Sequence, residues 1–314
     1  MIHKTTCKIC GSTSTSIVAY LQPRWGPACH ALRCHQCRFV WANPLPELTV
    51  EVLNQIYDQA YTEEIRRLEM GELNYEILYR ATLQQMNKVE RMCGGIGTAF
   101  NVGAMSLTSK VLHDLGWDLT VVEISSYAAQ SARKLWGIAV VEGRIEDVVL
   151  PQNYFDFIKF SHVIEHLADP LLVLNKLYGT LKPGGILLVE TDNGNGLKTT
   201  IEIAVRAILG ERLAANVVSR LTGKQLNKRY GRLLPYEHIS LFGKQSLSQA
   251  LEYAGLTVVE MFCPAQGDPV WFPFTVQSTR WSMLERVMAR VDGLGAKLGK
   301  GEVLVAFAQK PAVQ

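Results

Sequence analysis

The amino-acid sequence predicts a doubly wound α/β fold: a mostly parallel, seven-stranded sheet with helices on both faces, behind a small zinc-ribbon-like module. Two observations lead to this prediction. Short apolar runs alternate with helix-like segments from residue 98 to residue 190, and two Cys-x-x-Cys pairs precede them. Repeated strand–helix–strand units imply a parallel sheet with helices on both sides. The 314 residues are 48% hydrophobic and 19% charged, which is enough apolar side chain for such a core.

The first element is a cysteine-rich module at residues 1–45. Cys7 and Cys10 form one Cys-x-x-Cys knuckle, and Cys34 and Cys37 form a second. Each knuckle can aim two thiolates at one ion, so the two together predict a tetrahedral Zn²⁺ site of the closed, structural type. Four buried or free thiols are the alternative. No export signal opens the sequence, so we expect a cytoplasmic protein, in which metal is favoured over disulfides.

Residues 46–93 are predicted to be a helical linker. From Leu48 onward, apolar residues recur at the spacing of one helical face, and Gly94 and Gly95 interrupt the pattern. The remaining residues, 94–314, are expected to form the main domain with its helical insertions.

The main domain begins with alternating strands and helices. The expected strands are 98–102, 119–122, 138–141, 155–160 and 186–190, and the helices between them are 109–115, 126–135 and 171–181. The elements expected after these are a segment that rejoins the core sheet at 238–242, a helix at 246–254, and strands at 256–262 and 303–308. Two insertions, 196–232 and 264–299, interrupt this order.

The insertion 196–232 has the pattern of a basic amphipathic lid. It holds eight lysines and arginines against Glu202 and Glu211, with apolar residues interleaved. Such a segment is expected to recognise an anionic substrate or to contact an anionic membrane surface peripherally. A solvated helix packed on the core is the alternative.

A specific resemblance begins at the expected fourth strand. Residues 155–170 read FDFIKFSHVIEHLADP, which is similar to the fourth-strand motif of class I S-adenosylmethionine-dependent methyltransferases. LKPGG at 181–185 resembles the turn before the family's fifth strand, and HISLF at 238–242 resembles the C-terminal signature of one branch. The resemblance covers about residues 96–262. It implies a Rossmann-like methyltransferase fold, a methyltransferase activity and S-adenosylmethionine as the cofactor.

The same branch includes proteins with an N-terminal four-cysteine module, notably enzymes that act on sugars and other small metabolites. The resemblance therefore implies a small-molecule or glycan/nucleotide-sugar-type acceptor. The net charge is only +3, so nucleic acid is not an expected partner.

The cofactor is expected beyond the carboxyl ends of the parallel strands, where open α/β sheets bind their ligands. Glu123 closes the second strand, and a carboxylate there can accept hydrogen bonds from both ribose hydroxyls. A solvated strand end is the alternative for Glu123. The other predicted cofactor contacts are Asn101, Gly103, Ala104, Ile124, Ile145, Glu146 and Ser161.

Three histidines, together with Glu165, are candidates for catalysis. Methyl transfer to a hydroxyl or an acidic carbon needs a base, and His162 and His166 flank the exit of the fourth strand. His238 is the third candidate, as base or as substrate ligand. The alternative for Glu165 and His166 is a structural role that holds the following helix.

Three residues depart from the family pattern and support a second hypothesis. Met105 and Leu107 stand where close backbone approach usually selects glycine, and Arg144 replaces an acidic residue in the third-strand loop. Either the cofactor binds through altered contacts, or the chain is a catalytically degenerate methyltransferase-fold protein that serves in ligand or partner binding. An RNA methyltransferase ranks last, because aromatic stacking motifs and strong basic charge are missing.

Overall fold

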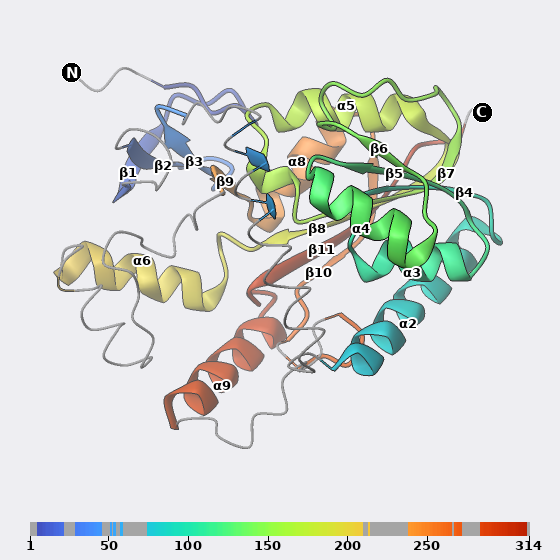
Figure 1. Cartoon of the computed structure of the whole chain (residues 1–314). Helices are drawn as coiled ribbons and strands as arrows, with labels where there is room; N and C mark the ends of the chain where they lie inside the picture. Colours follow the sequence, from blue (N-terminus) through green and yellow to red (C-terminus); the bar gives the residue numbers. More distant parts are fainter. Residues whose placement is uncertain are drawn as a thin grey trace.

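The computed structural model describes residues 5–21, 29–45, 51, 53–54, 57–58, 74–209, 213, 238–265, 267–271 and 283–312. A seven-stranded sheet forms the centre of the molecule, and a four-stranded sheet, which contains the blue N-terminal strands, lies at one end of it (Figure 1). Helices cover both faces of the central sheet. All described helices are too short or too polar to span a membrane.

The central sheet has the strand order β10-β11-β8-β7-β4-β5-β6. Neighbouring strands from β8 to β6 are parallel, and β11 pairs antiparallel with both β8 and β10. Its strands are β4 (Thr98–Val102), β5 (Asp118–Glu123), β6 (Val140–Glu142), β7 (Phe155–Ser161), β8 (Leu181–Asp192), β10 (Thr257–Phe262) and β11 (Val303–Gln309). The predicted fold class, a doubly wound and mostly parallel seven-stranded sheet, is confirmed.

The helices divide between the two faces of this sheet. Helices α2 and α3 pack on one face, and α5 and α8 pack on the other (Figure 1). The described helices are α2 (Tyr75–Cys93), α3 (Leu107–Asp114), α4 (Ser126–Trp136), η1 (Ile164–His166, a 3₁₀ turn), α5 (Pro170–Thr180), α6 (Leu197–Leu209), α8 (Lys244–Tyr253) and α9 (Met283–Lys297).

Alternating side chains of the central strands build two separate apolar layers. On β8, Ile186 and Leu188 face α2 and α3, whereas Leu187 and Val189 face α5 and α8. All four side chains are buried. Since both faces of the strand are covered here, residues 186–189 are apolar at consecutive positions instead of alternating with polar residues, which is why the sequence pattern predicted this part of the strand.

The predicted elements between residues 98 and 190 are all present, with shifted ends. Ser125 caps α4 as expected, because its side chain accepts a hydrogen bond from the backbone N–H of Ala128. The largest shift is in β8, which already begins at Leu181 and therefore contains the expected turn. Gly184 allows this path, since its φ of 84° lies in the left-handed region that favours glycine.

The four-stranded sheet joins the N-terminal module to a distant segment. It contains β1 (Thr15–Leu21), β2 (Cys29–Cys34) and β3 (Val40–Asn43), and its fourth strand is β9 (Ser240–Leu241). The boundaries proposed from the sequence for the three regions, 1–45, 46–93 and 94–314, stay predictions.

The expectation that residues 238–242 rejoin the core sheet is wrong for β9. This strand pairs antiparallel with β3, with Val40 opposite Leu241 and Trp41 opposite Ser240. Strand β8 already pairs with β7 and β11, so its edges are closed, whereas β3 offers unpaired backbone groups. Only Phe242 reaches the core, through an isolated bridge to Asn193 just beyond β8.

The two insertions lie partly outside the described residues. Of 196–232, the structure describes α6 with the residue before it and residue 213. Of 264–299, it describes residues 264–265, 267–271 and 283–299, which include α9. Helix α6 presents Ile201 and Ile208 to solvent, the latter 81% exposed. Most of the basic residues that predicted an anionic partner or a peripheral membrane contact lie outside the described part, so both stay predictions.

Candidate active site

One cavity of about 370 Å³ lies at the carboxyl ends of the parallel strands. It is where an open α/β sheet is expected to bind its ligand. The residues that line it are Leu53, Tyr57, Asn101, Val102, Gly103, Met105, Ser106, Thr108, Val122, Glu123, Ile124, Gly143, Arg144, Ile145, Glu146, Ser161, His162, Val163, His166 and Leu167. Among the predicted cofactor residues, all except Ala104 line this cavity, as do His162 and His166, while His238 does not.

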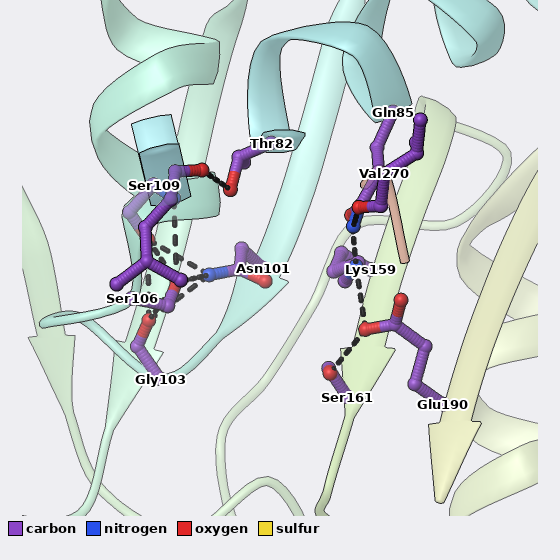
Figure 2. Close-up of polar contacts among 11 residues, drawn as sticks. Thr82, Gln85, Asn101, Gly103, Ser106, Ser109, Lys159, Ser161, Glu190 and Val270 are labelled. Carbon is purple, nitrogen blue, oxygen red and sulfur yellow. Dashed lines mark hydrogen bonds and ion pairs between the residues drawn. The ribbon is translucent and has the colours of Figure 1, made fainter. Parts of the chain in front are cut away.

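The loop after β4 is shaped by the buried side chain of Asn101. Its amide nitrogen lies 2.9 Å from the carbonyl oxygen of Gly103, 2.8 Å from Ser106 Oγ and 2.7 Å from Ser109 Oγ (Figure 2). The amide has two hydrogens, so it can donate to two of these three acceptors at a time. Asn101 therefore holds the loop and the start of α3 in one arrangement. Gly103 has a φ of 106°, which a side chain would strain.

The bulky residues in this loop leave the cavity open. Met105 lines the cavity, but most of its side chain is buried in an apolar cluster with Ala128, Ala129 and Val121 between β5 and α4. Leu107 begins α3 and does not line the cavity. Alanines on α4 provide the room that a larger residue would fill, so the departures from a glycine-rich loop do not block the site.

Glu123 is buried at the end of β5 and faces the cavity. One carboxylate oxygen accepts a hydrogen bond from the backbone N–H of Ala104 (2.8 Å), and the other accepts one from Ser125 (2.8 Å). A carboxylate has about four acceptor positions, so a group of this kind can hold two loops and also suit hydroxyl donors. The alternative of a solvated strand end does not fit this burial.

Arg144 lines the cavity in the loop after β6. Its guanidinium donates to Glu146 Oε1 over 2.7 Å, and this hydrogen bond raises the pKa of Arg144 although partial burial opposes it. Because a carboxylate two residues away neutralises it, the replacement of an acidic residue by Arg144 does not leave an unpaired cation in the site.

Residues of the predicted linker also reach the cavity, which the sequence did not indicate. Leu53 and Tyr57 line it, and the ring of Tyr57 meets the ring of His166 edge-on with centroids 6.0 Å apart. Asp58 accepts a hydrogen bond from Ser125 Oγ. The apolar spacing predicted a helix there, but could not show which strand ends the helix would cover.

A second polar group lies at the same strand ends, around Glu165. This carboxylate is fully buried on η1, accepts a hydrogen bond from Thr191 Oγ1 (2.8 Å), and lies 3.1 Å from His162 Nδ1. Burial alone raises a carboxyl pKa, but the hydrogen bond to His162 and the nearby histidines outweigh it and lower the pKa of Glu165 to about 2. Glu165 is therefore a buried anion, and the catalytic candidates lie around it.

His162 is the cationic partner of this anion. Its φ of 51° turns the side chain toward Glu165, in a region that few non-glycine residues adopt. Burial lowers the pKa of His162, but the hydrogen bond with Glu165 and the charges of Glu165, Asp192 and Glu190 prevail and raise the pKa to about 9. The raised pKa favours the protonated form of His162 at neutral pH.

Replacing His162 with asparagine, which tolerates positive φ, is expected to flatten the pH dependence of stability. A folded-state pKa of about 9 lies above the ordinary value of 6.5, so His162 stabilises the folded protein below pH 6.5 and loses this contribution as pH rises toward 9. The melting temperature of the original protein should therefore fall more steeply than that of His162→Asn over this interval. If the melting temperatures of the two proteins changed with pH in parallel, the ion pair between His162 and Glu165 would be contradicted.

His238 approaches the same carboxylate from the segment just before β9. Its Nε2 lies 3.9 Å from Glu165 Oε1, and its ring meets that of His166 with centroids 4.7 Å apart. Burial and the neighbouring His166 lower the pKa of His238 to about 4, against the opposing charge of Glu165. His238 is therefore neutral at pH 7.

Glu165, His166 and His238 also lie close enough to share one metal ion, a grouping that the sequence spacing did not indicate.

A buried ion pair that the sequence analysis did not predict lies next to the cavity. Lys159 Nζ lies 2.7 Å from Glu190 Oε2, and the same oxygen accepts a hydrogen bond from Ser161 Oγ over 2.5 Å (Figure 2). Lys159 also reaches Gln85 on α2 (3.3 Å), whose amide donates to the backbone oxygen of Val270. Burial disfavours the Glu190 anion, but Lys159 outweighs it and the pKa of Glu190 is lowered. Glu190 thus orients the hydroxyl group of Ser161, which lines the cavity.

The four knuckle cysteines form one cluster. Cys7 Sγ lies 3.5 Å from Cys37 Sγ, Cys10 Sγ lies 3.5 Å from Cys34 Sγ, and all four sulfur atoms are within 4.8 Å of one another. A tetrahedral ion with Zn–S bonds of about 2.3 Å needs sulfur atoms roughly 3.8 Å apart. The donor set therefore fits zinc. All seven cysteines are free of disulfides.

Comparison with known proteins agrees with this geometry. A family model described as "Methyltransferase domain" matches residues 92–261, which is more than half of the chain. The chain therefore belongs to the S-adenosylmethionine-dependent methyltransferase family. This match covers both the cavity-lining strand ends and the Glu165 cluster, apart from the residues of the linker.

Individual relatives are more distant. A ubiquinone biosynthesis O-methyltransferase from Dinoroseobacter shibae is 31% identical over 141 residues, so the match spans 45% of this chain and 46% of that protein. The 1,6-didemethyltoxoflavin-N1-methyltransferase of Burkholderia thailandensis, solved with 1,6-didemethyltoxoflavin and S-adenosylhomocysteine, has 13% identity and a TM-score of 0.50, covering 89% of this chain and 98% of its own. A possible histamine N-methyltransferase of Thermotoga maritima has 18% identity and a TM-score of 0.48, covering 82% and 99%.

Proposed function

We propose that this protein transfers a methyl group from S-adenosylmethionine to a small-molecule acceptor of the glycan or nucleotide-sugar type. One observation carries the proposal: a single cavity joins the loops after β4, β5 and β6 to His162 and His166 after β7. The first group of loops suits a nucleoside, and the second supplies acid–base chemistry beside it. The degenerate alternative is not favoured, because the bulky residues of the first loop leave the cavity open.

The residues present suit the cofactor. Glu123 is a buried carboxylate with acceptor capacity for ribose hydroxyls, and Gly103 brings backbone close to the cavity. The cofactor supplies an electrophilic methyl group on a sulfonium. Methyl transfer then depends mainly on alignment of the acceptor, which is the task of the residues that shape the cavity.

His162 and His238 differ in charge, so we assign them different tasks. His162 is a cation at neutral pH and suits an anionic group of the acceptor, whereas neutral His238 can accept a proton from a hydroxyl or an acidic carbon. Glu165 holds both in place.

We also propose that Zn²⁺ at Cys7, Cys10, Cys34 and Cys37 is structural and that the protein is cytoplasmic, which the free thiols favour.

S-adenosylhomocysteine is expected to raise the melting temperature, and Glu123→Ala should remove most of this shift. At a ligand concentration of about 100 times Kd, binding stabilises a protein by about 2.7 kcal/mol, which thermal unfolding detects readily. Glu123→Gln controls for size, and Glu142→Ala is a matched control because Glu142 lies outside the cavity and pairs with Arg133 on the surface. An unshifted melting curve of the original protein would refute cofactor binding.

The acceptor class is tested with methyl-labelled S-adenosylmethionine and a panel of nucleotide-linked sugars, each beside the same sugar without its nucleotide. Transfer of label to the nucleotide-linked members is expected. If the cofactor binds but label reaches only compounds outside this class, the acceptor proposal is wrong while the enzyme class stands.

About one zinc ion per chain is expected by metal analysis, because two knuckles complete one tetrahedral site. Cys34→Ser should abolish it, since a closed thiolate site needs all four ligands. Cys29→Ser is the matched control: Cys29 is also buried in the same sheet but lies outside the cluster, so its zinc content should not change. A folded, zinc-free original protein would contradict this prediction.

A further inference from the structure

We infer that the N-terminal cysteine module is a positioning element of the active site, because its strand β3 holds His238 against Glu165. This inference rests on the proposed function, in which His238 and Glu165 act on the acceptor. The module is thereby part of the catalytic apparatus and does more than stabilise the N-terminus.

The first step is the covalent path from the cysteines to β3. Cys34 ends β2 and Cys37 lies in the turn that leads into β3. The backbone N–H of Cys34 donates to the carbonyl of Phe39 over 2.9 Å, so the knuckle and the start of β3 form one hydrogen-bonded unit. A metal ion that binds Cys34 and Cys37 would therefore set the path of β3.

The second step is the pairing of β3 with β9. The backbone N–H of Ala42 donates to the carbonyl of Ile239 over 2.9 Å, next to the paired residues Trp41 and Ser240. The ring of Phe39 also packs against the ring of Phe242, with centroids 4.8 Å apart. Among the residues that the structure describes, β9 pairs with no other strand than β3, so β3 is its main backbone support.

The third step leads from β9 to the buried carboxylate. The backbone N–H of Ile239 donates to the carbonyl of Glu165 over 3.0 Å, and Ser240 Oγ lies 3.4 Å from the same oxygen. Ile239 thus bridges β3 on one side and Glu165 on the other. His238 directly precedes this bridge, which places its ring beside His166 and Glu165.

A separate contact ties the other knuckle to the same loop. Lys8 Nζ donates to the carbonyl of Ala168, just after η1, over 2.9 Å at the surface. This contact does not involve β9. It therefore offers a control that separates general attachment of the module from the specific path through β3.

The experiment measures the reactivity of His238 toward diethyl pyrocarbonate by peptide mass spectrometry, with and without zinc. His238 is largely buried, so chelation of zinc from the full chain is expected to raise its modification rate about ten-fold or more. His113 on α3, whose side chain is 47% exposed, should keep its rate and serves as the internal reference. Amide exchange of β4 and β5 should stay slow and reports that the core remains folded.

A second variant keeps the test decisive if zinc removal unfolds the chain. Ala42→Pro retains all four cysteines but deletes the donor to Ile239, so zinc should remain bound while His238 becomes reactive. Lys8→Ala, the matched control, should leave His238 protected. Continued protection of His238 in Ala42→Pro, with normal zinc content, would overturn the inference.

The result is separable from the proposed function. Binding of S-adenosylhomocysteine is measured on the zinc-loaded protein, and its failure would refute the cofactor proposal without changing the reactivity of His238. Conversely, a normal thermal shift with His238 protected in both zinc-free protein and Ala42→Pro would leave the enzyme class intact and refute only the positioning role.

Discussion

Lys159→Met is expected to destabilise the protein by about 3–5 kcal/mol, the usual cost of breaking a buried ion pair by removing one partner. Lys159 is 3% exposed and lies 2.7 Å from Glu190, in the middle of the central sheet. Methionine fills similar space, so the loss comes from the carboxylate that remains. Without Lys159, Glu190 either keeps an uncompensated charge or takes up a proton.

The measurement is urea-induced unfolding of the single variant, the double variant Lys159→Met/Glu190→Leu and a surface control. The double variant should recover most of the loss, because replacing both partners with apolar residues leaves no buried charge. Arg80→Met is the matched control: Arg80 and Glu76 form a pair 2.6 Å apart that is 73% and 64% exposed, so about 0–1 kcal/mol is expected. Equal losses in Lys159→Met and Arg80→Met would contradict the buried pair.

The effect of Lys159→Met should extend to the cavity. Glu190 accepts the hydrogen bond of Ser161, whose side chain lines the cavity, so a protonated or displaced Glu190 changes the orientation of that hydroxyl (Figure 2). The double variant loses the acceptor completely. A stable double variant with weaker binding of S-adenosylhomocysteine would separate the role of the pair in stability from its role in shaping the site.

The central sheet was predictable because burial on both faces leaves a strong signal in the sequence. Strand β8 is apolar at consecutive positions, and Ser125 marks the start of α4 by its capping side chain. The predicted cofactor residues, except Ala104, line the cavity, since the carboxyl ends of parallel strands converge on one edge. Their contacts with a cofactor stay predictions.

The parts that the sequence did not reveal depend on which strands are neighbours. Lys159 and Glu190 are 31 residues apart and meet only because β7 lies beside β8. The pairing of β9 with β3 joins segments about 200 residues apart, and two residues of strand carry too little pattern to predict a partner. In the same way, the alanines of α4 that accommodate Met105 could not be assigned to it before the packing was known.

His238→Ala is expected to lower kcat by about 10²–10⁴-fold, the range for loss of a general base, with little change in affinity for S-adenosylhomocysteine. His238 does not line the cavity predicted for the cofactor, but it lies 3.9 Å from Glu165 and is held neutral, which is the form that accepts a proton. The measurement is the steady-state rate with the acceptor found in the panel. His113→Ala is the control, because His113 lies in the last turn of α3 and does not line the cavity.

The pH profile identifies the base. With a pKa of about 4, His238 stays neutral throughout the range above pH 5, so its protonation should reduce kcat/KM only near pH 4. This acid limb should disappear in His238→Ala, whereas a structural role of the same side chain would lower the rate equally at every pH. An acid limb near 6.5, the ordinary value for histidine, would assign the base to another residue, and an unchanged rate in His238→Ala would exclude His238 from catalysis.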